Sequence, residues 1–127
     1  MEPLKFTACL AVRDVTETLD FFERIGYVVT RESIAPPHSI HMILDGDNPL
    51  FMIQPEHEVK EFMPFLAGYP VGGSGFFYIN TEEFDVTVAR IKGKAEVLKE
   101  SSEGGYKIFY FKDPNGYVFG INELISE

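Results

Sequence analysis

The sequence predicts an α+β fold in which two βαβββ modules form a cup-shaped, eight-stranded mixed sheet with the helices outside. Three observations predict this fold. Strand and helix signals follow the same order in both halves, each half has one amphipathic helix, and each helix ends at a glycine, Gly26 or Gly93. One helix covers only one face of its sheet, so two sheets that curl toward each other leave an inner concave space. An ordinary α+β domain with a filled core is the alternative.

The first module begins with a strand over 5–12 and a helix that starts after Asp14. Asp14 is a natural N-cap, and Glu17 three residues later completes a capping box. Apolar residues then recur at spacings of four, three and three, which places them on one helix face: Val15, Leu19, Phe22 and Ile25. Three further strands are expected at 27–34, 39–44 and 50–54.

The second module repeats this pattern. A strand is expected at 76–80, a helix capped by Thr81, and strands at 95–99, 106–112 and 117–123. The segment from Asp113 to Gly116 reads Asp-Pro-Asn-Gly and predicts a hairpin turn, because each residue suits its turn position. One domain over 1–127 is expected, with module one at about 4–54, a connection at about 55–75 holding a short helix broken at Pro64, and module two at about 76–125.

Charge and composition exclude several classes of function. Twenty acidic residues against eleven basic ones give a formal charge of −9, which disfavours nucleic acid and anionic membrane surfaces as partners. The single cysteine, Cys9, excludes an internal disulfide and a multi-cysteine zinc site. No apolar run approaches the ~18 residues of a membrane span, and the N-terminal residues contain neither a cationic segment nor a long apolar stretch, so no signal peptide is expected. A cytoplasmic protein without membrane contact is expected.

Three segments carry a family resemblance that covers essentially the whole chain. The first module contains Val-Arg-Asp at 12–14 and Phe-Phe-Glu-Arg-Ile-Gly-Tyr at 21–27, and the second contains Tyr-Phe-Lys-Asp-Pro-Asn-Gly-Tyr at 110–117. With the repeated module, these segments resemble the vicinal-oxygen-chelate superfamily. That superfamily includes glyoxalase I, bleomycin-resistance proteins, fosfomycin-resistance enzymes and extradiol dioxygenases. The resemblance implies two βαβββ modules, a cup-shaped sheet and a homodimer.

Family enzymes hold a divalent metal in the cup, and the resemblance maps the ligand positions onto Thr7, Phe51, Phe76 and Gly120. None of these residues is a credible ligand, because divalent cations need carboxylate, imidazole, thiolate or carbonyl groups. Neither a metal, a cofactor nor a catalytic residue is therefore expected. A binding protein is favoured over an enzyme, and a metal-dependent lyase, isomerase or dioxygenase with other ligands is the alternative.

Strand alternation predicts which side chains line the cup. The expected wall of the cup suits a small hydrophobic or aromatic molecule, and sequestration of an antibiotic or toxin is the expected role. Gly120 is expected to leave room for that ligand, although the aromatic residues could instead fill the cup as core. The expected ligand-binding residues are Thr7, Cys9, Phe51, Ile53, Phe76, Tyr78, Val118, Gly120 and Asn122.

Other candidate chemistry is sparse. His38 and His41 are expected on opposite strand faces, His57 in solvent, and Cys9 as an inert buried thiol. The connection at 55–75 is expected to cover an open edge of the cup in the homodimer, or to form a lid.

Overall fold

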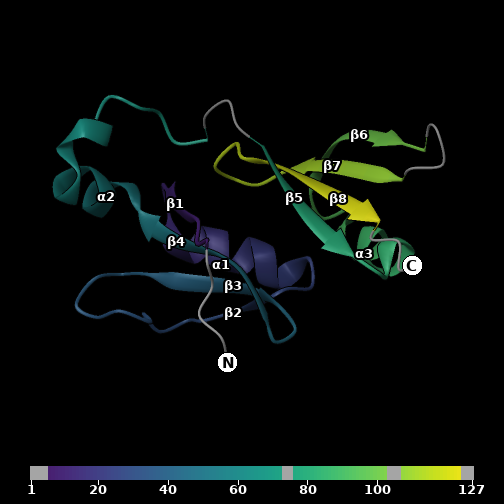
Figure 1. Cartoon of the computed structure of the whole chain (residues 1–127), viewed down its shortest axis with the longest axis horizontal. Helices are drawn as coiled ribbons and strands as arrows, with labels where there is room; N and C mark the ends of the chain where they lie inside the picture. Colours follow the sequence, from purple (N-terminus) through teal and green to yellow (C-terminus); the bar gives the residue numbers. More distant parts are fainter. Residues whose placement is uncertain (1–5, 73–75, 103–106, 124–127) are drawn as a thin grey trace.

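The computed structural model describes residues 6–72, 76–102 and 107–123. Their strands form two four-stranded sheets (Figure 1). In order across the first sheet lie β1 (Cys9–Val12), β4 (Asn48–Pro55), β3 (His41–Asp45) and β2 (Val28–Val29). In order across the second lie β5 (Phe76–Thr81), β8 (Val118–Glu123), β7 (Ile108–Lys112) and β6 (Glu96–Ser101).

The two sheets share one topology. The first strand of each module pairs parallel to the last, β1 with β4 and β5 with β8, and the other neighbours are antiparallel. Helix α1 (Val15–Arg24) follows β1, and α3 (Phe84–Ile91) follows β5. The predicted α+β class and the two βαβββ modules are confirmed.

A short helical segment connects the modules, as the sequence predicts. Helix α2 (Glu56–Phe62) ends just before Pro64, where a separate 3₁₀ turn, η1 (Pro64–Leu66), begins. Proline lacks the N–H that would continue the α-helix. None of the helices in the described ranges is long and apolar enough to span a membrane.

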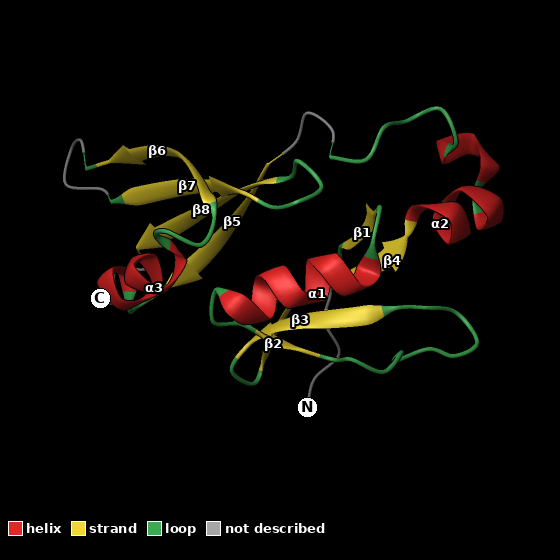
Figure 2. Ribbon diagram, turned by 180° about the vertical axis from the view of Figure 1, so that it is seen from behind, coloured by secondary structure: helices red, strands yellow, loops and turns green. Residues whose placement is uncertain are grey.

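Phe22 of α1 links the two sheets in one hydrophobic core. Its ring centroid lies 5.4 Å from that of Phe51 on β4 and 5.5 Å from that of Phe119 on β8, and its side chain is 0% exposed. Phe21 likewise approaches Phe111 on β7. Figure 2 shows α1 lying along the first sheet, beside the second. The helix-facing sides of both sheets therefore share this core, and their other sides, called here the open faces, point away from it.

Asp14 caps α1 as the sequence predicts. Its backbone is extended, and its Oδ1 accepts a hydrogen bond of 2.9 Å from the Glu17 backbone N–H. Replacing Asp14 with alanine leaves that N–H without a side-chain partner, and we expect the free energy of unfolding to fall by about 1 kcal/mol. Urea denaturation checks this value, and an unchanged midpoint would contradict the capping role.

The strand expected at 27–34 is wrong beyond its first residues, because β2 ends at Val29. Two backbone hydrogen bonds continue past β2, from the Thr30 N–H to the Met42 carbonyl and from the Ile34 N–H to the Ile40 carbonyl, and side chains replace the rest of the ladder. Thr30 Oγ1 accepts a hydrogen bond from the Met42 N–H, and Ser33 Oγ accepts from the N–H groups of Ala35 and Ile40. Ser and Thr hydroxyls compete with sheet pairing in this way, which periodicity alone does not reveal.

Thr81 is not the residue that caps the second helix. It ends β5, its Oγ1 accepts a hydrogen bond from the Glu83 N–H, and α3 begins only at Phe84. A threonine hydroxyl forms this two-residue local bond readily. Thr81 therefore marks the turn that leads into α3.

The turn between β7 and β8 ties the second module to the first. Asn115 Oδ1 accepts a hydrogen bond from the Arg13 N–H at 2.9 Å, and Asn115 Nδ2 donates to Thr18 Oγ1 at 3.0 Å and to Asp113 Oδ2 at 2.9 Å. Tyr117 Oη donates to the Ala11 carbonyl at 2.8 Å. The predicted hairpin turn thus also acts as a clamp between the modules.

Candidate functional site

The open face of the second sheet gathers five of the nine residues that the sequence predicts for binding. The parallel register pairs Phe76 with Val118, Tyr78 with Gly120 and Asn80 with Asn122. Paired residues share a sheet face. This face therefore carries Phe76, Tyr78, Val118, Gly120 and Asn122.

The open face of the first sheet carries Cys9. Thr7 is exposed just before β1, and Cys9 pairs with Met52 in the register. The Cys9 thiol lies 3.9 Å from Gln54 Oε1, within hydrogen-bonding distance for sulfur. Cys9 is exposed and not buried as expected, although partial burial of its thiol raises its pKa.

Phe51 and Ile53 lie on the opposite face from the one expected. Phe51 is 7% exposed and Ile53 is 0% exposed, and both belong to the core. Met52 and Gln54 take the open face instead. The strand position is estimated from spacing to within a residue or two, and a slip of one residue exchanges the two faces. The polar Gln54 between Ile53 and Pro55 is the signal that could have set the register.

Gly120 does not leave an empty space. A Cβ atom at this position would lie 2.9 Å from ring atoms of both Tyr78 and Tyr110, so the two tyrosine rings fill the volume above the glycine. Their hydroxyl oxygens lie 3.1 Å apart. This hydrogen bond is the main reason why the pKa of Tyr78 is raised, and burial is the second reason. The pair adds two hydroxyl groups to a face that also carries the amides of Asn80 and Asn122.

A cleft of about 330 Å³ opens where the two sheets meet. It brings together three of the predicted residues, Phe51, Phe76 and Tyr78. Phe76 is 56% exposed at its mouth. The remaining lining is apolar: Phe6, Ala8, Leu10, Leu50, Phe77, Ile79 and Phe119.

A second apolar cleft, of about 240 Å³, lies on the other side of β1 beside the connecting helix. Cys9 and Gln54 line it from the open face, and Val59 and Met63 line it from α2 and its C-terminal end. Tyr117 contributes from the second module. The connection therefore covers part of the first open face. The sequence alone allows two alternatives for the connection, a lid or an arm that covers an edge in the dimer.

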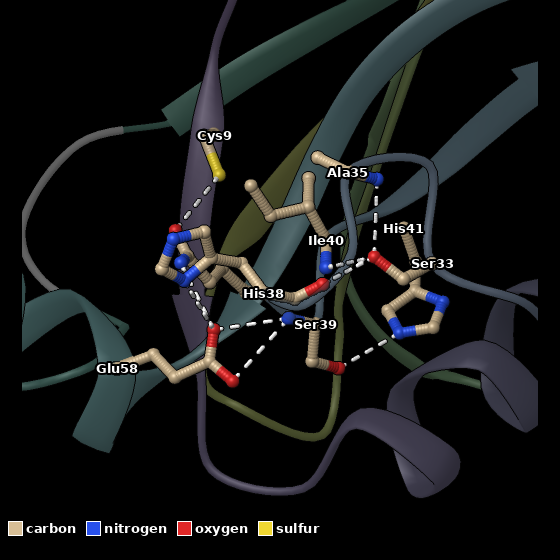
Figure 3. Close-up of polar contacts among 9 residues, drawn as sticks. Cys9, Ser33, Ala35, His38, Ser39, Ile40, His41 and Glu58 are labelled. Atoms are coloured by element: carbon tan, nitrogen blue, oxygen red, sulfur yellow. Dashed lines mark hydrogen bonds and ion pairs between the residues drawn. The ribbon is translucent and has the colours of Figure 1, made fainter.

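Glu58 of α2 organises a polar cluster at the end of this face (Figure 3). Its carboxylate accepts hydrogen bonds from the Ser39 N–H at 3.0 Å and from Gln54 Nε2 at 3.2 Å, and these bonds lower its pKa. His38 Nδ1 lies 3.9 Å away. His41 is buried apart from His38, with its ring nitrogens against Ser39 Oγ and the Thr30 carbonyl. These contacts hold the loop between β2 and β3 in place.

The open faces do not offer a donor set for a divalent metal. Their polar groups near the positions implied by the resemblance, among the described residues, are neutral: the hydroxyls of Thr7, Tyr78 and Tyr110, the Cys9 thiol with its raised pKa, and the amides of Gln54, Asn80 and Asn122. Across the described ranges, no three His, Cys, Asp or Glu residues gather in a metal-binding group. Neutral amides and a protonated thiol lack the charge that divalent ions require. The residues present therefore do not fit the family's metal.

Solved structures share this architecture. The chain is similar to a protein of unknown function from Agrobacterium tumefaciens (18% identity, TM-score 0.75, covering 98% of both chains). It is also similar to a fosfomycin resistance protein from Listeria monocytogenes (18%, 0.65, 98% of this chain and 96% of that one). A bleomycin-binding protein complexed with bleomycin matches as well (14%, 0.67, 97% and 100%). At these identities the likeness concerns the fold.

The sequence itself is matched at the level of a family. No curated protein matches it. The family model described as Glyoxalase/Bleomycin resistance protein/Dioxygenase superfamily matches residues 5–121. This match agrees with the resemblance carried by the repeated module and by the segments at 12–14, 21–27 and 110–117. The chain belongs to the Glyoxalase/Bleomycin resistance protein/Dioxygenase superfamily.

Proposed function

We propose that this protein binds a small hydrophobic or aromatic molecule, without a metal ion, at the cleft between its two sheets. The observation that carries the proposal is the aromatic mouth of that cleft, where Phe76 and Tyr78 stand about half exposed above an apolar floor. Apolar clefts with a few placed hydroxyl or amide groups are typical small-molecule sites. The Tyr78–Tyr110 and Asn80–Asn122 pairs supply such groups beside it.

Sequestration of an antibiotic or toxin in the cytoplasm is the activity that this proposal assigns. It is supported by the apolar wall and by the poor fit of the donor set to a metal ion. Structural neighbours that include a bleomycin-binding protein and a fosfomycin resistance protein agree with it at the level of fold. The acidic surface favours neutral or cationic ligands over anionic ones.

A homodimer completes the site in this proposal. The connection covers only part of the first open face, and the aromatic side chains Phe76 and Tyr78 of the second are about half exposed. A drug-sized ligand usually has most of its surface buried when bound. A second copy of the chain, placed against these faces, would enclose the ligand between subunits. Mass measurement by size exclusion with light scattering should give twice the chain mass of 14.4 kDa. A monomer at all concentrations would contradict the dimer.

Calorimetric titration with a panel of aromatic antibiotics and dyes tests binding. We expect at least one ligand to bind, and the variant Phe76→Ala to bind it about tenfold more weakly, a loss of about 1.4 kcal/mol that is in the range of one aromatic contact. Val86→Ala is the matched control, since Val86 is also 56% exposed but lies on α3. That variant should bind like the parent.

Three results would contradict the proposal. The first is no binding to any member of a broad panel, and the second is equal loss of affinity in Phe76→Ala and Val86→Ala. The third is a near-stoichiometric transition metal in the purified protein by elemental analysis. The metal result would favour the lyase, isomerase or dioxygenase alternative.

A further inference from the structure

Basic side chains gather in a cleft between α1 and the second sheet, although the chain as a whole is acidic. The cleft measures about 610 Å³. Among the described residues, four basic and two acidic side chains line it, although the chain as a whole has eleven basic and twenty acidic residues. The four are Arg13, Arg24, Lys94 and Lys112.

Three of these cations have no carboxylate partner within the described part of the chain. Most other described basic side chains do have one. Arg31 contacts Asp20 and Glu23, and Lys60, Lys92 and Lys107 each lie within 4.0 Å of a carboxylate. In the cleft, only Lys112 has such a contact, at 4.0 Å from Glu96. The charges of Arg13, Arg24 and Lys94 are therefore available to a ligand.

The two arginines are anchored without being neutralised. The Arg13 backbone N–H donates to Asn115 Oδ1 at 2.9 Å, which fixes the start of its side chain. The Arg24 guanidinium carbon lies 5.8 Å from the ring centroid of Phe21, which is a cation–π distance. A guanidinium held in this way keeps its N–H groups for carboxylate or phosphate oxygens.

The two acidic residues oppose an anion only weakly. Asp113 is buried and turned into its own loop, where its Oδ1 accepts from the N–H groups of Asn115 and Tyr117 and its Oδ2 accepts from Asn115 Nδ2. Glu96 is exposed and reaches only Lys112. The cleft thus keeps an excess of positive charge at its surface.

We propose that this cleft binds a small polyanion that carries phosphate or carboxylate groups. Several like charges along one cleft focus the field and raise the local concentration of an opposite ion. Two arginines and two lysines match a molecule with two or more anionic groups. The cleft shares no lining residue with the cleft between the sheets. This binding is therefore independent of the aromatic ligand.

Calorimetry of the full chain with pyrophosphate and with citrate, at constant ionic strength, tests the proposal and distinguishes the two anion chemistries. We expect saturable binding of at least one probe, weakening as salt rises. The triple variant R13Q/R24Q/K94Q should bind about 30-fold more weakly. The control K99Q removes one charge from β6 outside the cleft and should bind like the parent.

Two single variants keep the test decisive if the triple variant folds poorly. Lys94→Gln removes one exposed cation and should weaken binding about threefold. Glu96→Gln removes the exposed opposing charge and should tighten binding about threefold. Absence of saturable binding of either probe to the parent would overturn the proposal, as would equal affinities of the parent, K94Q and E96Q.

Discussion

Replacing Phe22 with alanine is expected to lower the free energy of unfolding by about 3–5 kcal/mol, in the range for a buried Phe→Ala change. The reason is the position of its ring between the two sheets, in contact with Phe51 and Phe119 and with the neighbouring Phe21 and Tyr27. Removing the ring leaves a cavity that these aromatic side chains can collapse into only partly, because Phe21, Phe51 and Phe119 are fixed to α1, β4 and β8.

Chemical denaturation followed by circular dichroism measures the loss. Phe62→Ala is the control, since Phe62 is 74% exposed at the end of α2 and should change stability by less than about 0.5 kcal/mol. Because Phe22 joins both sheets, unfolding of the two modules should remain one cooperative transition in the parent. Equal effects of the two substitutions would contradict the role of Phe22 as the core of both sheets.

Much of the fold follows from local sequence signals. The helix over Val15–Arg24 combines a capping aspartate with an apolar stripe, and both act within a few residues. The signal for the hairpin turn at 113–116 likewise lies in the four residues of the turn. The strand expected at 27–34 could not be predicted correctly, because the N–H of Met42, on the neighbouring strand β3, donates a hydrogen bond to the Thr30 hydroxyl.

The candidate site could be predicted only in part, and the reason is register. Phe76, Tyr78 and Gly120 share a face as expected, because alternation along β5 and β8 needs no outside reference. For Phe51, the strand start was uncertain by a residue, and that error exchanges core and open face. The filling of the space above Gly120 required Tyr110, which lies on β7 and is brought there only by strand pairing.

The basic cleft could not be predicted from the sequence either, because the fold brings its residues together from separate elements. Arg13 precedes α1, Arg24 ends it, and Lys94 follows α3, so no local pattern groups them. Overall acidity even suggests that no anion would bind. Charge balance summed over a chain therefore describes the mean surface, and the fold decides where the minority charge collects.

Asn115→Ala should reduce stability by about 3 kcal/mol, the second large effect that we expect. The substitution removes one side chain that satisfies three groups in the two modules: the Arg13 N–H, Thr18 Oγ1 and Asp113 Oδ2. Asn115 is buried, and each buried polar group left without a partner costs about 1–3 kcal/mol, less where water enters. Asn80→Ala is the matched control, because Asn80 is exposed and bonds only to Asn122.

A second variant tests the clamp from the opposite side. Gly72 has a φ of +80°, and a Cβ atom there would collide with the Asn115 carbonyl oxygen, so Gly72→Ala must push the turn away from the connection. We expect Gly72→Ala and Asn115→Ala to destabilise less together than the sum of their separate effects, since either one already opens the same contact. Thermal and urea denaturation of the four chains of this double-mutant cycle measure the coupling. Strict additivity would mean that the turn holds the modules together through other contacts.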